Sequence, residues 1–142
     1  MYKKILVPTD ASEFSLRAFQ AAVEMARCFQ AEIVLLHVSY TPQSLFGHIP
    51  NYEFAISQED LVASGKAALE ATLASTSYEG VPVKKVLEVG YPAIKIIEQI
   101  KKDDIELVIM GSRGYGPLTG SVLGSVSQRV VQKSPVPVLI IK

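Results

Sequence analysis

The feature that most limits what this chain can fold into is the alternation of apolar, strand-like runs with helical patterns along its whole length. Continuous apolar runs, among them IVLLHV at 33–38, LVIM at 107–110 and PVPVLII at 135–141, recur between segments with helical spacing. A strand that is apolar at successive positions is buried on both faces, as in a parallel sheet covered by helices. The alternation therefore predicts an α/β fold: an open five-stranded parallel sheet with helices on both faces.

The spacing of apolar residues sets the expected elements. Strands are expected at Lys4–Val7, Ile33–Val38, Val83–Val89, Ile105–Met110 and Val136–Ile141. Helices are expected after the capping residue Ser12 and over Glu59–Ser75, Tyr91–Lys102 and Val126–Lys133. In the helix over Tyr91–Lys102, Ile94, Ile97 and Ile100 are expected to face the core. Residues Tyr40 to Gln58 are expected to be irregular, because prolines and a glycine interrupt any period there.

Size and charge narrow the class of protein. A chain of 142 residues without a break in composition is expected to form one domain over residues 1–142. Lysine plus arginine equals aspartate plus glutamate, 14 each, so no basic excess indicates a nucleic-acid partner. No apolar run approaches a membrane span or a signal peptide, and the single cysteine, Cys28, is expected to serve packing. We expect a cytoplasmic protein that binds neither nucleic acid nor a membrane.

A glycine-dense turn between the fourth strand and the last helix is the strongest indication of function. Residues 111–125 read GSRGYGPLTGSVLGS, with glycines at 111, 114 and 124 and a serine at 125. Glycine lets successive amides point at one anion, and a helix that follows adds unpaired amides and the positive end of its dipole. The turn is therefore a candidate phosphate site, although a turn of this composition also occurs for conformational reasons alone.

The carboxyl end of the first strand, Val7-Pro8-Thr9-Asp10, would face that turn if strands one and four are neighbours, an adjacency that the sequence leaves open. The parts then match a nucleotide. Asp10 can accept from an adenine amine or a ribose hydroxyl, and the backbone near Val38 can edge the base. Asp10 can equally act as a helix cap, and Arg113 can be a solvated loop residue rather than a phosphate ligand.

Several kinds of site have no sequence support. The phosphate-binding lysine motif, the dinucleotide fingerprint and the nucleophile elbow are all missing, and no His/Cys/Asp cluster has metal-ligand spacing. His37 is expected to be structural. Asp103 and Asp104, at the end of a helix, are expected to form a solvated corner.

The chain resembles the universal stress protein family. The resemblance rests on ILVPTDAS at 5–12, IVLLHV at 33–38, LVIMGSRG at 107–114, the G-x2-G-x9-G-[ST] spacing at 111–125 and PVPVLII at 135–141. It implies the strand order 3-2-1-4-5 of a Rossmann-like, adenine nucleotide alpha hydrolase-like fold. The intact glycine motif implies the ATP-binding branch, with magnesium accompanying the nucleotide and no dedicated metal ligand.

The resemblance also assigns positions. It implies contacts to the base from Pro8, Thr9, Asp10 and Val38, to the ribose from Met110 and Gly111, and to the phosphates from Gly114, Gly124, Ser125 and Val126. Apart from the resemblance, the residues themselves offer Arg113 as a further phosphate candidate. It implies a homodimer joined through Val136–Ile141. A bare apolar edge strand would invite such pairing, unless the prolines at 135 and 137 blunt it.

Three functions stay open at this point. The first is a cytoplasmic ATP-binding sensor or regulator in which nucleotide orders the loop between Gly114 and Gly124. The second is a slow ATPase or nucleotidyl transferase, for which Arg113 and Arg129 are the nearby cations. The third is a nucleotide-free dimeric module that binds protein partners through the segment between Tyr40 and Gln58, with Leu45, Phe46, Tyr52 and Phe54.

Overall fold

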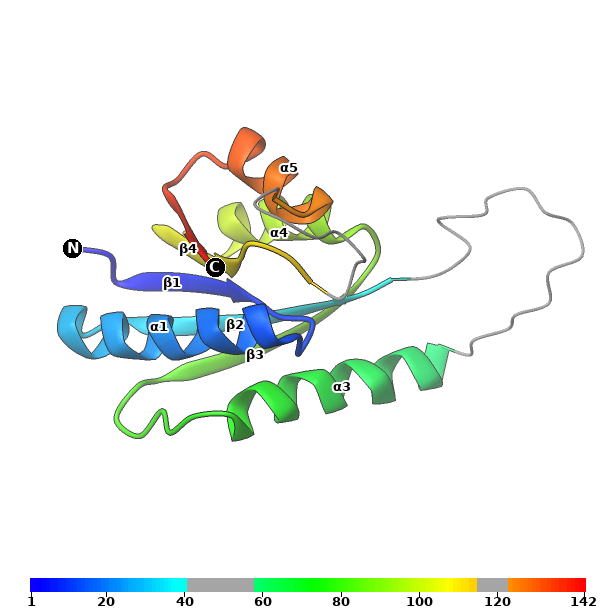
Figure 1. The fold of residues 1–142 in the computed structure, drawn as a ribbon, viewed down its shortest axis with the longest axis horizontal. Helices are drawn as coiled ribbons and strands as arrows, with labels where there is room; N and C mark the ends of the chain where they lie inside the picture. The colour runs from blue at the N-terminus through cyan, green and yellow to red at the C-terminus, as the bar shows by residue number, and fades with distance from the viewer. Residues whose placement is uncertain (41–57, 115–122) are drawn as a thin grey trace, which may run out of the picture.

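The computed structural model is built around one parallel sheet of five strands in the order β3-β2-β1-β4-β5 (Figure 1). The structure describes residues 1–40, 58–114 and 123–142. In these ranges the chain forms β1 (Lys4–Pro8), α1 (Glu13–Phe29), β2 (Glu32–Ser39), α3 (Gln58–Ala74), β3 (Val83–Val89), α4 (Pro92–Lys102), β4 (Leu107–Gly111), α5 (Ser125–Lys133) and β5 (Val138–Ile141). The predicted fold class and the strand order are confirmed.

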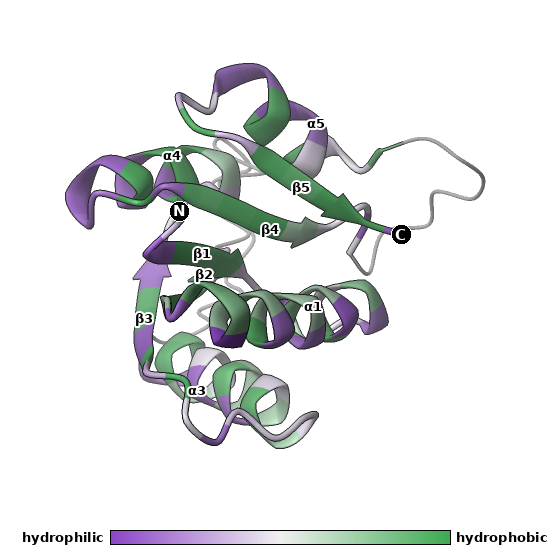
Figure 2. Cartoon of the chain, turned by 90° about the vertical axis from the view of Figure 1, so that its left-hand side faces the viewer, coloured by the Kyte–Doolittle hydropathy of each residue, from purple (hydrophilic) through white to green (hydrophobic). Residues whose placement is uncertain are grey.

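The helices cover both faces of the sheet because the central strands have no polar face. In β1, Ile5, Leu6 and Val7 are all fully buried, and β4 is buried along its length. Strands β1, β4 and β5 are accordingly hydrophobic in Figure 2, whereas the outward side of α1 is hydrophilic. Alternate residues of β1 enter different clusters: Ile5 and Val7 pack with α1 and Leu69 of α3, and Leu6 packs with α4 and α5.

Helix α4 buries Ile100 as predicted, but the other apolar residues that it buries are Ala93 and Ile96, not Ile94. Ile94 is 49% exposed and Ile97 only partly buried, whereas Ile96 and Ile100 are buried together with Ala93. Two adjacent apolar rows run along this helix, and the row at 93, 96 and 100 contacts the sheet. The expectation for Ile94 was wrong because periodicity alone does not rank two neighbouring rows.

Cys28 also departs from expectation, since it is exposed on α1 instead of packed. Ala26, two residues earlier, is buried, so the face of α1 that packs on the core includes Ala26 and not Cys28.

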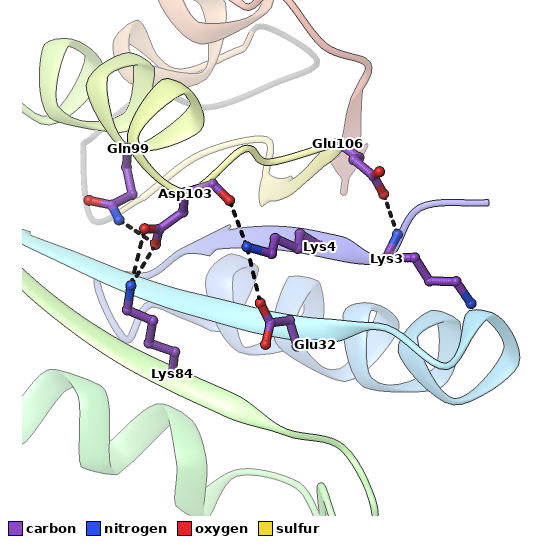
Figure 3. Close-up of polar contacts among 7 residues, drawn as sticks. All are labelled: Lys3, Lys4, Glu32, Lys84, Gln99, Asp103 and Glu106. Carbon is purple, nitrogen blue, oxygen red and sulfur yellow. Dashed lines mark hydrogen bonds and ion pairs between the residues drawn. The ribbon is translucent and has the colours of Figure 1, made fainter.

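Asp103, at the end of α4, is not the solvated corner that was expected. Its side chain is 11% exposed, forms a 3.0 Å ion pair with Lys84 Nζ of β3 and accepts a 2.7 Å hydrogen bond from Gln99 Nε2 (Figure 3). Its carbonyl accepts from Lys4 Nζ of β1, and Lys4 also pairs with Glu32 of β2. Burial favours the neutral acid, but the hydrogen bonds from Lys84 and Gln99, with the charges of Lys84 and Lys4, outweigh it and lower the Asp103 pKa.

The last strand is shorter than predicted and forms an edge of the sheet. β5 begins at Val138 instead of Val136, because Pro137 has no amide to donate; its carbonyl accepts a 3.0 Å hydrogen bond from Val108 N. The expectations for the segment between Tyr40 and Gln58 and for the loop between Gly114 and Gly124 lie almost entirely outside the described residues. In the part of the chain that the structure describes, no helix is long and apolar enough to span a membrane.

Candidate functional site

A cavity of about 280 Å³ opens beyond the carboxyl ends of β1 and β4, where the strand order reverses. This position is where open α/β sheets bind ligands, because the connections leave β1 and β4 toward opposite faces of the sheet. The cavity is lined by Pro8, Thr9, Asp10, Ser15, Leu36, Val38, Pro92, Ile96, Met110, Gly111, Arg113, Gly114, Gly124, Ser125, Val126 and Ser127. All eleven residues nominated from the sequence therefore line one cavity.

Asp10 is held in place by the first turn of α1. Its Oδ1 accepts hydrogen bonds from the Ser12 amide at 2.9 Å and from Ser15 Oγ at 3.1 Å. Ser12 is the N-cap of α1, so Asp10 supports the start of the helix while its other oxygen lies toward Gly114. Ala11 between them has φ 61°, a left-handed conformation that L-residues adopt at a cost. The cap and the site roles considered for Asp10 are thus compatible.

Gly114 is a glycine because Asp10 occupies the space of a side chain. A Cβ atom at position 114 would lie 2.2 Å from Asp10 Oδ2. Any larger residue must therefore displace the carboxylate that Ser12 and Ser15 position.

Gly111 is required by the fold in a way that the sequence did not reveal. A Cβ at this position would lie 2.7 Å from Phe14 Cβ, 2.8 Å from Phe14 C and 3.0 Å from Phe14 O. Helix α1 therefore crosses the end of β4 at backbone contact. The absent side chain would point at α1, so packing already explains this glycine without a nearby sugar.

Thr9 lines the cavity, but its polar groups serve the fold. Its Oγ1 lies 2.7 Å from Thr72 Oγ1 and donates to Ser15 Oγ at 3.1 Å, and its amide donates to Leu36 O at 2.8 Å. Nδ1 of His37 lies 2.8 Å from the Thr9 carbonyl, which fixes Nδ1 as the protonated ring nitrogen because a carbonyl only accepts. His37 is thereby tied to the turn after β1, as expected for a structural residue.

The first turn of α5 brings backbone donors to the cavity. Gly124 is the N-cap, no side chain caps the helix, and the first turn contains no acidic residue. The Gly124 carbonyl accepts from Gln128 N at 2.9 Å, which closes the first turn and leaves the amides of Ser125, Val126 and Ser127 without intrahelical acceptors. These amides and the helix dipole favour a negative charge.

The amide of Gly124 itself is already used. It donates to Ser112 O at 2.8 Å, and Ser127 Oγ donates to the same carbonyl at 2.8 Å. This hydrogen bond ties the glycine turn to the start of α5, so the Gly124 amide is engaged within the protein, and the predicted phosphate contact from position 124 stays a prediction. The available donors lie one to three residues further along the chain.

Five lining residues were missed by sequence reasoning: Ser15, Leu36, Pro92, Ile96 and Ser127. Leu36 could have been predicted from the sequence, because it lies two residues before Val38 and alternate residues of a strand share a face. Pro92 and Ile96 lie one turn apart on α4, whose approach to the end of β2 follows from the packing. Ser15 and Ser127 act through bonds to Asp10 and Ser112, which no spacing in the sequence indicates.

The cavity has an apolar part and a polar part. Leu36, Val38, Ile96 and Met110 supply an apolar part, and the start of α5 supplies a polar part. In the ranges described, Asp10 and Arg113 are the charged residues of the lining, and no group of three or more His, Cys, Asp or Glu could hold a metal ion.

An open parallel sheet with its cavity at the reversal of strand order defines a doubly wound α/β protein. The chain belongs to the universal stress protein family, whose model matches residues 1–142. It is similar to universal stress protein YxiE of Bacillus subtilis, with 34% identity over the full length of both chains.

Two solved structures extend the comparison. The structure of MJ0577 from Methanocaldococcus jannaschii has a TM-score of 0.82 at 32% identity and covers 100% of this chain and 96% of that one. A universal stress protein from Archaeoglobus fulgidus, solved in complex with dAMP, has a TM-score of 0.73 at 22% identity, with 99% and 98% of the two chains covered. At that identity the likeness shows the fold alone.

Proposed function

We propose that this protein binds ATP, accompanied by Mg²⁺, in the cavity beyond β1 and β4, and acts as a nucleotide-dependent regulator in the cytoplasm. The observation that carries the proposal is the division of the cavity between an apolar part and an uncapped helix N-terminus. The G-x2-G-x9-G-[ST] motif at 111–125, which resembles that of the ATP-binding branch, supports ATP as the ligand. The dAMP complex of the distant Archaeoglobus fulgidus relative supports an adenine nucleotide more generally.

The apolar part suits the base. Leu36, Val38 and Ile96 offer aliphatic surface to a purine ring, as expected of ligand pockets in which a few polar groups set orientation. Asp10 is the lining carboxylate, and it is already fixed by Ser12 and Ser15. It would accept a hydrogen bond from a ribose hydroxyl or a base amine.

The start of α5 suits the phosphates. Three successive amides, with the Ser125 hydroxyl beside them, would form charge-assisted hydrogen bonds of about 1.5–3 kcal/mol each. These bonds together contribute about 6–12 kcal/mol before the cost of association, and micromolar affinity needs about 8 kcal/mol net, so burial of the base in the apolar part must supply the remainder.

Magnesium fits this site as a companion of the phosphates. It prefers oxygen ligands and keeps several waters, and it commonly binds through substrate phosphates with one or two carboxylates. Asp10 is the carboxylate within the described lining, and it already accepts two hydrogen bonds. The ion would supply charge neutralisation for the phosphate chain.

We further propose regulation rather than efficient hydrolysis, and a homodimer paired through Val136–Ile141. In the described lining the charged residues are Asp10 and Arg113, with no lysine and no histidine, and Asp10 Oδ1 already accepts hydrogen bonds from Ser12 and Ser15, so efficient phosphoryl transfer is not expected. β5 is an edge strand, and Leu139 on it is 38% exposed. Phosphate release and the mass in solution by light scattering test these two points.

Calorimetric titration with ATP and Mg²⁺ tests the binding proposal. The expected result is a micromolar Kd and a rise in Tm; no heat and no thermal shift at millimolar ATP would reject it. Asp10→Asn keeps an acceptor for Ser12 while removing the charge, and it should weaken ATP and adenosine alike, about tenfold. Denaturing the freshly purified protein and searching the supernatant for adenine absorbance gives an independent check.

A further inference from the structure

We infer that the aromatic ring of Phe14 positions the guanidinium of Arg113 in the cavity, and that this pair sets the preference of the site for a ligand with a phosphate chain over the bare nucleoside. The inference rests on the proposed function and goes beyond it by naming the groups that determine ligand charge. Phe14 lies outside the glycine motif, and Arg113 would act through its side chain and not through its backbone amide.

The first step is the placement of Phe14. It lies in the first turn of α1, and its backbone meets Gly111 at the end of β4 so closely that a Cβ on Gly111 would be 2.7–3.0 Å from it. The ring therefore sits beside the turn that follows β4. Two residues after Gly111, Arg113 has its Cζ 5.0 Å from the centroid of the Phe14 ring.

The second step is the consequence of that contact for Arg113. A guanidinium within about 6 Å of an aromatic centroid is attracted by the ring quadrupole, and the planar group stacks. Arginine otherwise has large rotamer freedom, which it would lose on binding a ligand. Stacking on Phe14 restricts that freedom beforehand, so less is lost when a phosphate arrives.

The third step is charge. Within the described lining the charged residues are Asp10 and Arg113. Arg113 is the positively charged side chain of that described lining, so its charge is the one that attracts a phosphate chain. A nucleoside has no group that needs it, and the pair should therefore discriminate ATP from adenosine.

Arg17 supplies a matched control. Its Cζ also lies 4.9 Å from the Phe14 centroid, but it pairs with Glu13 at 3.0 Å and does not belong to the described lining. Removing it takes one cation from the same ring without touching the proposed binding group.

The experiment is a titration of wild type and variants with ATP, AMP and adenosine in the presence of Mg²⁺. Arg113→Gln should raise the Kd for ATP about tenfold and leave adenosine within about twofold. Phe14→Leu keeps the Cβ against Gly111 but loses the ring face, and should raise the Kd for ATP about threefold. Phe14→Tyr should restore wild-type affinity, and Arg17→Gln should retain it.

A double-mutant cycle separates positioning from general packing. If Phe14 acts through Arg113, Phe14→Leu should have no further effect on ATP in an Arg113→Gln background. Additive effects, or equal losses for ATP and adenosine, would overturn the inference.

Two further outcomes keep the test decisive. If Phe14→Leu does not fold, Arg113→Lys replaces it, since lysine keeps the charge but loses the stacking plane; unchanged ATP binding by Arg113→Lys would overturn the role of the ring. Wild type that prefers ATP to adenosine, with Arg113→Gln keeping the whole of that preference, would refute this inference alone. Wild type that binds neither would refute the proposed function and the inference with it.

Discussion

Replacing Gly111 by alanine should destabilise the protein strongly, although the change adds a single methyl group. The new Cβ would lie 2.7 Å from Phe14 Cβ and 2.8 Å from Phe14 C, whereas carbon atoms in van der Waals contact are about 3.5–4.0 Å apart. The main chain of Phe14 cannot rotate away, so the first turn of α1 must shift outward by about 1 Å. That shift also pulls on Ser12 and Ser15, which hold Asp10.

Overpacking of this kind costs about 1–3 kcal/mol. For a domain of this size each kcal/mol lowers Tm by about 3–4 °C, so a loss of about 3–12 °C is expected. Thermal unfolding followed by circular dichroism measures it.

Gly124→Ala is the matched control for this prediction. Its Cβ would meet Arg113 Cα at 3.4 Å and Ser112 O at 3.5 Å, which are ordinary contacts, and Gly124 has φ −64°. This variant should keep its stability within about 0.5 kcal/mol. Equal melting of wild type and Gly111→Ala would refute the argument that α1 meets β4 at backbone contact.

Three further predictions follow from the packing. Gln30 ends α1 with φ 53° and ψ 48°, so Gln30→Gly should stabilise the protein by about 1 kcal/mol in urea unfolding, with no gain from Gln30→Ala. Thr72 is fully buried and shares a 2.7 Å hydrogen bond with Thr9, so Thr72→Val should cost about 1–3 kcal/mol while Thr72→Ser costs clearly less. The Asp103 pKa is lower in the folded state than in the unfolded state, so its contribution is complete above about pH 3.9 and is lost as the pH falls through the folded-state pKa. The free energy of unfolding in urea should therefore fall less between pH 6 and pH 3 in Asp103→Asn than in wild type. An equal fall in both proteins would contradict the role of the pairing between Asp103 and Lys84.

The fold class was predictable because the apolar runs that form the strands can be recognised along the sequence itself. Strands such as LVIM at 107–110 are apolar at every position, which fits burial on both faces of a parallel sheet. The strand order came from the family resemblance and not from the residues alone. The face of α4 was not predictable, because Ile94 and Ile96 are equally apolar and only the packing against the sheet distinguishes them.

The site was predictable to the extent that it is built from strand ends. Asp10 follows the end of β1 by two residues and Gly111 is the last residue of β4, so both reach the same edge of two neighbouring parallel strands. What sequence reasoning could not supply are the individual contacts that the folded chain makes around those strand ends. The approach of Phe14 to Gly111, the hydrogen bond from Ser15 to Asp10 and the ion pair of Asp103 all depend on three-dimensional packing.

The central claim is that the start of α5 receives the phosphate chain of a nucleotide, and Ser125→Glu tests it most directly. The positive end of the helix dipole stabilises a carboxylate in the first turn, so the variant should melt at or slightly above the Tm of wild type. The same carboxylate would repel phosphate. Calorimetry with ATP and Mg²⁺ should therefore show an affinity at least about tenfold weaker than that of Ser125→Gln, which loses the same hydroxyl without adding a charge. Equal ATP affinity in Ser125→Glu, Ser125→Gln and wild type would contradict the account.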